Sequence, residues 1–257
     1  METFLPLSSP ARNDWVRVPF PVPACLTLRA AGDMRRDGEG RGRFYQSVGL
    51  DPEKVLVVGQ VHSRTVVVVP ADTGAGGQGV IGRRTAIGEH FTPDADGLIT
   101  DDANAVLGVT VADCMPIYLY DMATGARGLL HSGWRGTGIL GTAIGMLRDQ
   151  FGSRPEDLMV TMGPCISVES YEVDESRAGE FAAEWGEGAV RREAGRCYLD
   201  LRAANHEICR RNSVDLINVI NHCTVRESRL GSYRREGPDR YTLMLAFLGG
   251  TLQLGDR

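Results

Sequence analysis

The sequence has no apolar run approaching the roughly 20 residues that a membrane-spanning helix needs. Its opening, METFLPLSSPARNDW, lacks a basic stretch followed by an apolar core, so we expect no secretory signal. The six cysteines have no spacing typical of a disulfide framework, and we expect reduced thiols in the cytoplasm. The net charge is -5, so the chain lacks the excess of basic residues that is typical of nucleic-acid-binding proteins. We therefore expect neither a membrane nor a nucleic acid as partner.

The 257 residues are 42% hydrophobic and 24% charged, which is typical of a globular protein with a substantial core. Strand-like and helix-like segments mix without the strict alternation of a doubly wound parallel sheet. We find no low-complexity linker and no repeat of fixed period. The sequence therefore predicts an α/β (α+β) fold, with mixed β-sheets and packed helices in a single domain over residues 1–257.

The most informative stretch runs from residue 106 to residue 151. Apolar segments at 106–111, 115–120 and 126–130 predict strands, and the turn chemistry of 121–125 makes the last two a hairpin. If Tyr120 lies opposite Ala126, Cys114 falls within about one residue of His131. The glycine-rich residues 132–138 then lead into a predicted helix at 139–151. A thiol and an imidazole are therefore expected at one end of the hairpin.

Elsewhere the pattern predicts further elements on both sides of this stretch. An irregular arm is expected up to residue 17, and residues 33–42, 72–82 and 226–237 are expected to be loops or turns. Asp174 and Asp200 are predicted helix N-caps. The predicted helices are 43–48, 174–185 and 201–212, and the predicted strands are 18–28, 54–61, 65–70, 98–100, 158–162, 171–173, 197–200, 215–220 and 241–248.

Three residues at strand ends carry soft or borderline metal ligands: His62, Cys114 and His131. Together they would form a three-ligand zinc site, one per chain, with a fourth position open to water or substrate. Zinc would lower the pKa of that water enough to supply a nucleophile at neutral pH. The same atoms also suit a cysteine nucleophile, with Cys114 as thiolate and His131 as base. His62 has a part only in the zinc hypothesis.

Other ligand-type residues are interpreted as structural. His222 and Cys223 are adjacent, so a strand would point them to opposite faces. His90 has no recognisable partner, and His206 is expected on the exposed side of its helix. The acidic pairs at 94–96 and 101–102 lack the spacing of a calcium loop and are interpreted as turns.

Six motifs occur in an order that resembles one family. They are Gln60-Val61-His62, Ala95-Asp96-Gly97-Leu98, Ala112-Asp113-Cys114-Met115-Pro116, His131-Ser132-Gly133-Trp134-Arg135-Gly136, Gly163-Pro164-Cys165-Ile166 with Tyr171-Glu172-Val173, and Ser232-Tyr233-Arg234-Arg235. Over about residues 54–248 the series resembles the laccase-domain family, also called the polyphenol oxidoreductase or purine nucleoside phosphorylase family. The resemblance implies a laccase-domain-like α/β fold and one zinc ion at His62, Cys114 and His131.

The resemblance also implies an enzyme that cleaves purine nucleosides such as adenosine, inosine and, by extension, methylthioadenosine, with phosphate, and that can deaminate adenosine. The chain departs from the family pattern at three positions. Ser63 follows the QVH motif, where the family commonly has glycine. Thr27 replaces the asparagine of an Asn-Leu-Gly element, and Gly42 replaces the asparagine of an Asn-Arg pair. These departures bear on the wall that faces the substrate and leave the three metal ligands intact.

Charged residues in the motifs give the remaining site predictions. Arg64, Arg135 and Arg234 are expected to hold phosphate, because guanidinium groups match its oxygens bidentately. Asp113 and Glu172 are expected to carry protons. Besides the cysteine hydrolase, the alternatives are a copper-dependent phenol oxidase and a non-catalytic zinc-bearing binding module. Copper is disfavoured because a multicopper site needs many histidines and the chain has five.

Overall fold

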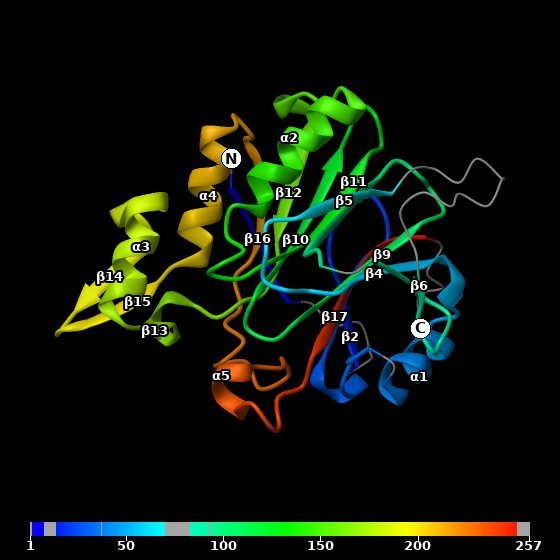
Figure 1. The fold of residues 1–257 in the computed structure, drawn as a ribbon, viewed down its shortest axis with the longest axis horizontal. Helices are drawn as coiled ribbons and strands as arrows, with labels where there is room; N and C mark the ends of the chain where they lie inside the picture. Colours follow the sequence, from blue (N-terminus) through cyan, green and yellow to red (C-terminus); the bar gives the residue numbers. More distant parts are fainter. Residues whose placement is uncertain (1, 8–13, 37, 70–82, 93, 251–257) are drawn as a thin grey trace.

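The computed structural model of the protein describes residues 2–7, 14–36, 38–69, 83–92 and 94–250. Two seven-stranded sheets and one three-stranded sheet form the fold, with helices on the outer faces (Figure 1). Each large sheet contains both parallel and antiparallel pairs, as the sequence predicts. Within the described part of the chain, no helix combines the length and apolar character that crossing a membrane requires.

The first large sheet contains the predicted hairpin. Its order is β1-β16-β12-β10-β11-β8-β5. In that order the strands are Glu2–Leu5, Leu216–Ile220, Leu158–Met162, Met115–Asp121, Arg127–Ser132, Gly97–Thr100 and Val66–Val69.

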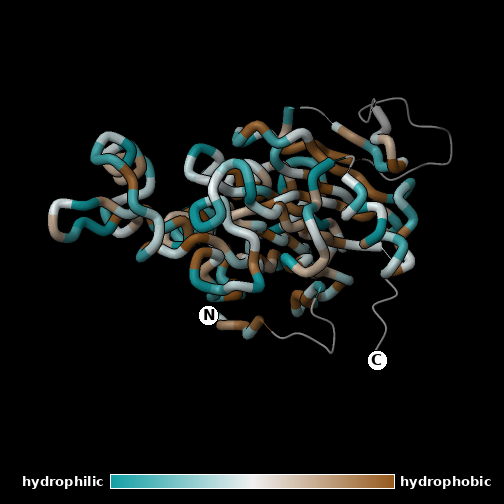
Figure 2. The backbone as a smooth tube through the Cα atoms, turned by 90° about the horizontal axis from the view of Figure 1, so that it is seen from below, coloured by the Kyte–Doolittle hydropathy of each residue, from teal (hydrophilic) through white to brown (hydrophobic). Residues whose placement is uncertain are grey.

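The second large sheet has the order β2-β3-β17-β9-β4-β7-β6. Its strands are Trp15–Arg17, Ala24–Thr27, Met244–Gly249, Val106–Val111, Val55–Val58, His90–Thr92 and Arg83–Arg84. The third sheet, β13-β15-β14, contains Glu172–Val173, Arg196–Leu199 and Val190–Glu193. Together with α3 it projects from one end of the molecule and is largely hydrophilic (Figure 2).

The helices are α1 Glu39–Ser47, α2 Ile139–Phe151, α3 Glu175–Trp185, α4 Leu201–Arg211 and the short α5 Tyr233–Glu236. Helix α2, with α4 beside it, covers the outer face of the first large sheet, α1 lies on the second, and α3 packs on the third sheet and α4 (Figure 1). One apolar core lies between the first sheet and helices α2, α3 and α4, a second between the two large sheets, and a third between the second sheet and α1. The hairpin strand β10 is buried on both faces, as its continuous apolar sequence requires.

Several predicted elements are confirmed with their bounds. Strands β9 and β12 and helix α2 occupy 106–111, 158–162 and 139–151. Asp174 and Asp200 are N-caps, because their side chains accept hydrogen bonds from the backbone amides of Arg177 and of Arg202 and Ala203. The six cysteines are free thiols. The loop predicted at 72–82 lies outside the described residues.

The register predicted for the hairpin was wrong by one residue. Tyr120 pairs with Arg127 instead of Ala126, so Cys114 lies beside Gly133 and two residues from His131. The Asp121 side chain accepts from the amides of Ala123 and Thr124, and its backbone amide donates to the carbonyl of Ala126. Asp121 itself therefore pairs with Ala126, and the register shifts by one residue. Strand β11 also continues through His131, which the sequence placed after the strand.

Segments near the N-terminus also differ from expectation. The predicted irregular arm contains β1 and β2. The predicted strand 18–28 is reduced to β3, because prolines at 19, 21 and 23 remove backbone donors. Helix α1 begins at Glu39, inside the predicted loop 33–42. The polar turn 226–237 contains α5, and the closing strand begins at Met244 instead of Tyr241.

A buried ion pair explains the early start of α1. Arg41 is 2% exposed, and its Nη1 lies 3.1 Å from each carboxylate oxygen of Glu89. The rest of the guanidinium donates to the carbonyl of Met34, and the Tyr45 hydroxyl also donates to Glu89. Tertiary contacts therefore hold a glycine-rich segment helical against its weak helix propensity.

We expect Arg41→Ala to lower the free energy of unfolding by about 3–5 kcal/mol, because it leaves the Glu89 carboxylate buried without its cation. Arg43→Ala is the matched control on the same helix, since the ion pair of Arg43 with Glu39 is exposed and its loss should cost about 0.5 kcal/mol or less. Urea denaturation of both variants measures the difference. Equal losses would contradict the assignment.

Candidate metal centre

The loop after β4 carries His62, and the side chain of Gln60 fixes its course. The Gln60 amide donates to the carbonyl of Thr110 at 2.8 Å and accepts from the Thr110 backbone amide, also at 2.8 Å. These two bonds tie the loop to the end of β9, beyond the last pair of β4 and β9. His62 then adopts a left-handed backbone with φ of 60°, which turns the chain sharply.

Asp96, just before β8, connects this loop to β11. Its Oδ2 accepts from the amide of Ser63 at 2.6 Å, from the Ser63 hydroxyl at 2.8 Å and from the Val61 amide at 3.2 Å. Its Oδ1 accepts from the His62 amide at 3.0 Å and lies 2.8 Å from Nδ1 of His131. Burial opposes ionisation of this carboxyl, but the hydrogen bonds from His131 and Ser63 outweigh it and lower its pKa to about 2. Asp96 therefore stays ionised and directs the Nε2 of His131 away from itself.

Cys114 belongs to the turn between β9 and β10. It follows Asp113, whose φ of 82° is left-handed. Gly133 lies beside it across the hairpin, and a Cβ atom at Gly133 would lie 2.7 Å from the Cys114 sulfur. The glycine of the His131-Ser132-Gly133 sequence is therefore needed to leave room for the thiol.

His62, Cys114 and His131 converge, as predicted. Their ligand atoms all lie within 4.8 Å of one another, and the two imidazole rings are 4.9 Å apart in an edge-to-face arrangement. Ligand atoms bound to one tetrahedral zinc ion would lie about 3.3–3.8 Å apart, which is close to this spacing. The Cys–His–His donor set suits a borderline-soft ion, and the exposed position of His62 leaves one side open. The residues present therefore fit such a metal.

The electrostatics of the trio favour a thiolate. Burial opposes ionisation of Cys114, but the charges and hydrogen bonds of His131 and His62 lower the pKa of the thiol below its usual value. Burial likewise opposes protonation of His131, but the Cys114 charge and the Asp96 hydrogen bond raise its pKa. The thiolate is the form that binds metals and attacks electrophiles, so the arrangement suits both chemistries.

Asp113 points its carboxylate toward α5. Its Oδ1 accepts from the Thr224 hydroxyl at 2.5 Å, and its Oδ2 accepts from the Arg234 amide at 2.6 Å. Its carbonyl accepts from the amide of Ile166. The residue next to Cys114 thus connects three separate segments of the chain.

The other predicted residues surround the trio at varied positions. Glu172 is exposed, with its carboxylate 3.5 Å from Arg196. Arg64 forms a two-bond ion pair with Glu184, at 2.5 and 2.7 Å. Arg234 donates through its guanidinium to the carbonyls of Ser170 and Glu172.

Trp134 is half-buried, and two guanidinium groups lie near its ring. Arg135 is exposed, with its guanidinium 5.2 Å from the Trp134 ring centre, and Arg177 from α3 lies 4.4 Å from the same centre. Sequence reasoning missed Arg177, because nothing in the sequence indicates that the first turn of α3 lies against this loop. It also missed Asp96, although the Ala95-Asp96-Gly97-Leu98 motif was a signal.

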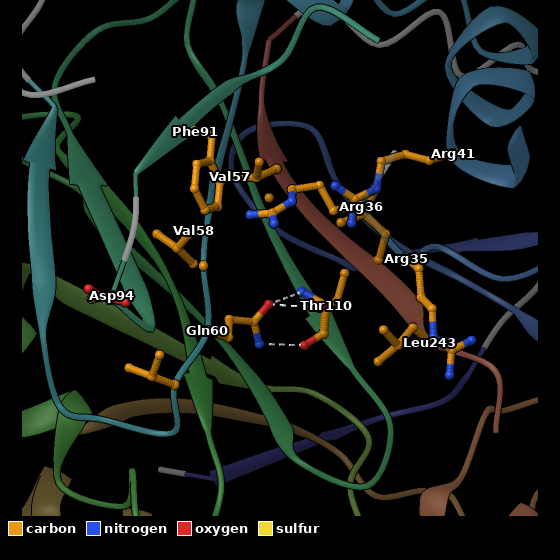
Figure 3. A pocket seen from close by; sticks show the side chains of 14 residues that line it. Arg35, Arg36, Arg41, Val57, Val58, Gln60, Phe91, Asp94, Thr110 and Leu243 are labelled. Carbon is orange, nitrogen blue, oxygen red and sulfur yellow. Dashed lines mark hydrogen bonds between the residues drawn. The ribbon is translucent and has the colours of Figure 1, made fainter. Parts of the chain in front are cut away.

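A cavity of about 530 Å³ borders the stretch that leads to His62. Gln60 and Thr110 form one side of it, and Phe91, with the Arg36 guanidinium 4.2 Å from its ring centre, forms another (Figure 3). None of the three ligand residues lines it, so the cavity lies beside the metal centre and does not contain it.

The chain is similar to known proteins over most of its length. A family model described as "Multi-copper polyphenol oxidoreductase laccase" matches residues 29–248. A purine nucleoside phosphorylase of Corynebacterium glutamicum is 32% identical over 210 residues, which is 80% of this chain and 78% of that protein. A purine nucleoside phosphorylase of Deinococcus radiodurans is 32% identical over 233 residues, 84% of each chain.

Solved structures show the same fold. The crystal structure of YlmD from Geobacillus stearothermophilus matches with a TM-score of 0.80 and 27% identity, covering 95% of this chain and 98% of that one. Protein NMB0706 of Neisseria meningitidis matches with a TM-score of 0.71 and 26% identity, covering 92% of this chain and all of that one. The family match includes His62, Cys114 and His131 and covers most of the chain, so this protein belongs to the multi-copper polyphenol oxidoreductase laccase family.

Proposed function

We propose that this protein is a zinc-dependent purine nucleoside phosphorylase that cleaves adenosine, inosine and methylthioadenosine with phosphate, and that the same site deaminates adenosine. The observation that carries the proposal is the convergence of His62, Cys114 and His131, with one side open, in a chain whose relatives are named purine nucleoside phosphorylases. The six free thiols support a reducing compartment such as the cytoplasm.

In this proposal, His62, Cys114 and His131 hold one zinc ion per chain. Zinc with three protein ligands supplies Lewis acidity at its open position. Asp96 orients His131 by accepting from Nδ1, so that Nε2 faces Cys114, and it holds the His62 loop by accepting from three successive amides. The donor set and the five hydrogen bonds to Asp96 support this assignment.

The phosphate is assigned to the arginines around the trio. Arg135 is exposed and lies in the loop between β11 and α2, so it is our first choice. Arg64 and Arg234 are engaged with Glu184 and with backbone carbonyls, and binding phosphate would require them to exchange these partners. The proton-transfer roles of Asp113 and Glu172 stay predictions.

A cysteine hydrolase is the second hypothesis. It is favoured by the arrangement of Cys114, His131 and Asp96, which resembles a nucleophile, its base and the acid that orients the base. A copper-dependent phenol oxidase is disfavoured, because the chain's other three histidines are not part of the trio's cluster. A non-catalytic zinc-bearing module would bind metal without turnover.

The first prediction separates the zinc enzyme from the hydrolase. We expect purified protein to carry about one zinc per chain, and His62→Ala and Cys114→Ala each to lose most of it and all turnover, because two remaining ligands hold zinc weakly. Metal analysis and a nucleoside phosphorolysis assay measure both. His206→Ala is the control, since His206 lies on α4 next to Glu2.

A hydrolase would give another pattern. His62→Ala would keep its activity, and iodoacetamide would alkylate Cys114 rapidly in zinc-replete protein, because no metal would occupy the thiolate. The zinc hypothesis expects slow alkylation that becomes fast after chelation. Full activity in His62→Ala would exclude zinc as the essential group.

The second prediction concerns Asp96. Asp96→Asn keeps the shape of the side chain but replaces one accepting oxygen by a donor, so His131 and the His62 loop lose part of their support. We expect zinc affinity, measured by competition with a chelating dye, to fall about 10–100-fold. Asp94→Asn is the matched control, because Asp94 is exposed and asparagine tolerates its φ of 53°. Unchanged affinity in Asp96→Asn would remove Asp96 from the site.

The third prediction concerns phosphate. We expect Arg135→Ala to raise the KM for phosphate about 10–100-fold, the loss expected for hydrogen bonds to a charged group, with zinc content unchanged. Steady-state kinetics with phosphate varied at saturating inosine measures this effect. Arg148→Ala, an exposed arginine on α2, should behave as wild type. A variant that unfolds, loses zinc or keeps its phosphate KM would leave Arg135 without this role.

A further inference from the structure

The loop that joins β11 to α2 begins in direct contact with the metal centre. A Cβ atom at Gly133 would lie 2.7 Å from the Cys114 sulfur and 3.6 Å from Cδ2 of His62. Trp134 and Arg135 are the next two residues of this loop. Their backbone therefore starts beside the thiol and one of the two imidazoles.

Hydrogen bonds and a close packing contact fix both ends of this loop. The carbonyl of Gly133 accepts from the Thr137 amide at 2.6 Å and from the Thr137 hydroxyl at 2.7 Å. A Cβ atom at Gly136 would lie 3.0 Å from the carbonyl oxygen of Ser63, so the far end of the loop touches the chain next to the other ligand loop. The two residues between these glycines are therefore presented at the metal centre by a closed turn.

The ring of Trp134 has two guanidinium groups near it. The ring packs against the apolar core between the first sheet and helices α2, α3 and α4. The Arg177 guanidinium, from the first turn of α3, lies 4.4 Å from the ring centre, and the Arg135 guanidinium lies 5.2 Å from it. A guanidinium that lies over an aromatic ring uses its flat face, so the N–H donors at its edge stay available.

The other contacts of these two arginines are few. Arg177 lies 3.9 Å from the carboxylate of Asp174, which already accepts from the Arg177 backbone amide. Among the described residues, no carboxylate lies within ion-pair distance of the Arg135 guanidinium. By contrast, Arg64 is held in a two-bond ion pair, and Arg234 donates to backbone carbonyls. Arg135 and Arg177 are therefore the arginines whose donors are best placed to accept an anion.

We propose that Arg177 binds the phosphate of the reaction together with Arg135, and that Trp134 is the positioning residue for both guanidiniums. The inference rests on the proposed phosphorylase function, which supplies phosphate as the ligand, and it adds a residue of α3 to the site. Two guanidiniums offer paired N–H donors to different oxygens of one ion, and their charges balance those of the phosphate dianion. Arg135 is exposed, so rotation of its side chain brings it to the same ion as Arg177.

The test varies phosphate at saturating inosine in the zinc-replete, full-length protein. Arg177→Ala should raise the KM for phosphate about 10–100-fold, the loss expected for hydrogen bonds to a charged group, with kcat and zinc content unchanged. Arg177→Lys keeps the charge but loses the planar fork, so its KM should rise less. Arg191→Ala is the matched control and should behave as wild type, because the Arg191 guanidinium lies 4.8 Å from the Tyr198 ring centre on the third sheet.

Further variants test the shared ion and the role of the ring. The double variant Arg135→Ala/Arg177→Ala should raise the KM for phosphate by less than the product of the two single effects, because both side chains contact the same ion. Trp134→Leu should raise this KM about 2–30-fold with kcat retained, and Trp134→Phe, which keeps an aromatic face, should restore most of the loss.

Calorimetric titration with inorganic phosphate separates this inference from the phosphorylase proposal, because binding needs no turnover. Unchanged phosphate binding in Arg177→Ala, or a double variant whose effect equals the product, would overturn the inference and leave the phosphorylase proposal standing. A loss of zinc or of kcat at unchanged KM would show that Arg177 is structural and would also overturn it. A wild-type protein that binds phosphate through Arg177 without cleaving inosine would overturn the phosphorylase proposal alone.

Discussion

The buried carboxylate of Asp96 is the interaction on which the site depends. An isolated buried charge is costly, and this one is compensated by five hydrogen bonds from the 61–63 loop and His131. The loop leaves the second large sheet after β4, whereas His131 lies on β11 of the first. One carboxylate therefore joins the two sheets at the point where His62 and His131 must meet.

A second carboxylate does similar work on the other side of the thiol. Asp113 connects the turn of Cys114 to Thr224 and to the start of α5. The guanidinium of Arg234, on α5, in turn donates a hydrogen bond to the backbone segment that contains Tyr171. Cys114 is thus held between a hairpin that requires glycine at Gly133 and a network of backbone hydrogen bonds. A metal site needs such support, because its ligands must be oriented before the ion binds.

Much of the fold could be predicted because local patterns are strong where both faces of an element are buried. Strands β9 and β12 and helix α2 have continuous or periodic apolar residues and have the predicted bounds. The prediction failed where the chain follows tertiary contacts: helix α1 begins early through the Arg41–Glu89 pair, and the hairpin shifts by one residue through the turn at Asp121. The hydrophobic pattern of a short segment does not show which distant residues that segment will contact.

The sequence by itself determined the buried strands, the hairpin and the longer helices, and it indicated His62, Cys114 and His131 as candidate ligands, because hydrophobic periodicity and side-chain chemistry are local properties. Only the tertiary structure decided that Asp96 orients His131, that Arg64 pairs with Glu184, and that Arg177 lies against the Trp134 ring. The physical reason is that each of these contacts joins residues dozens of positions apart. Their distance is set by how two sheets and a projecting helix pack, and sequence spacing does not encode it.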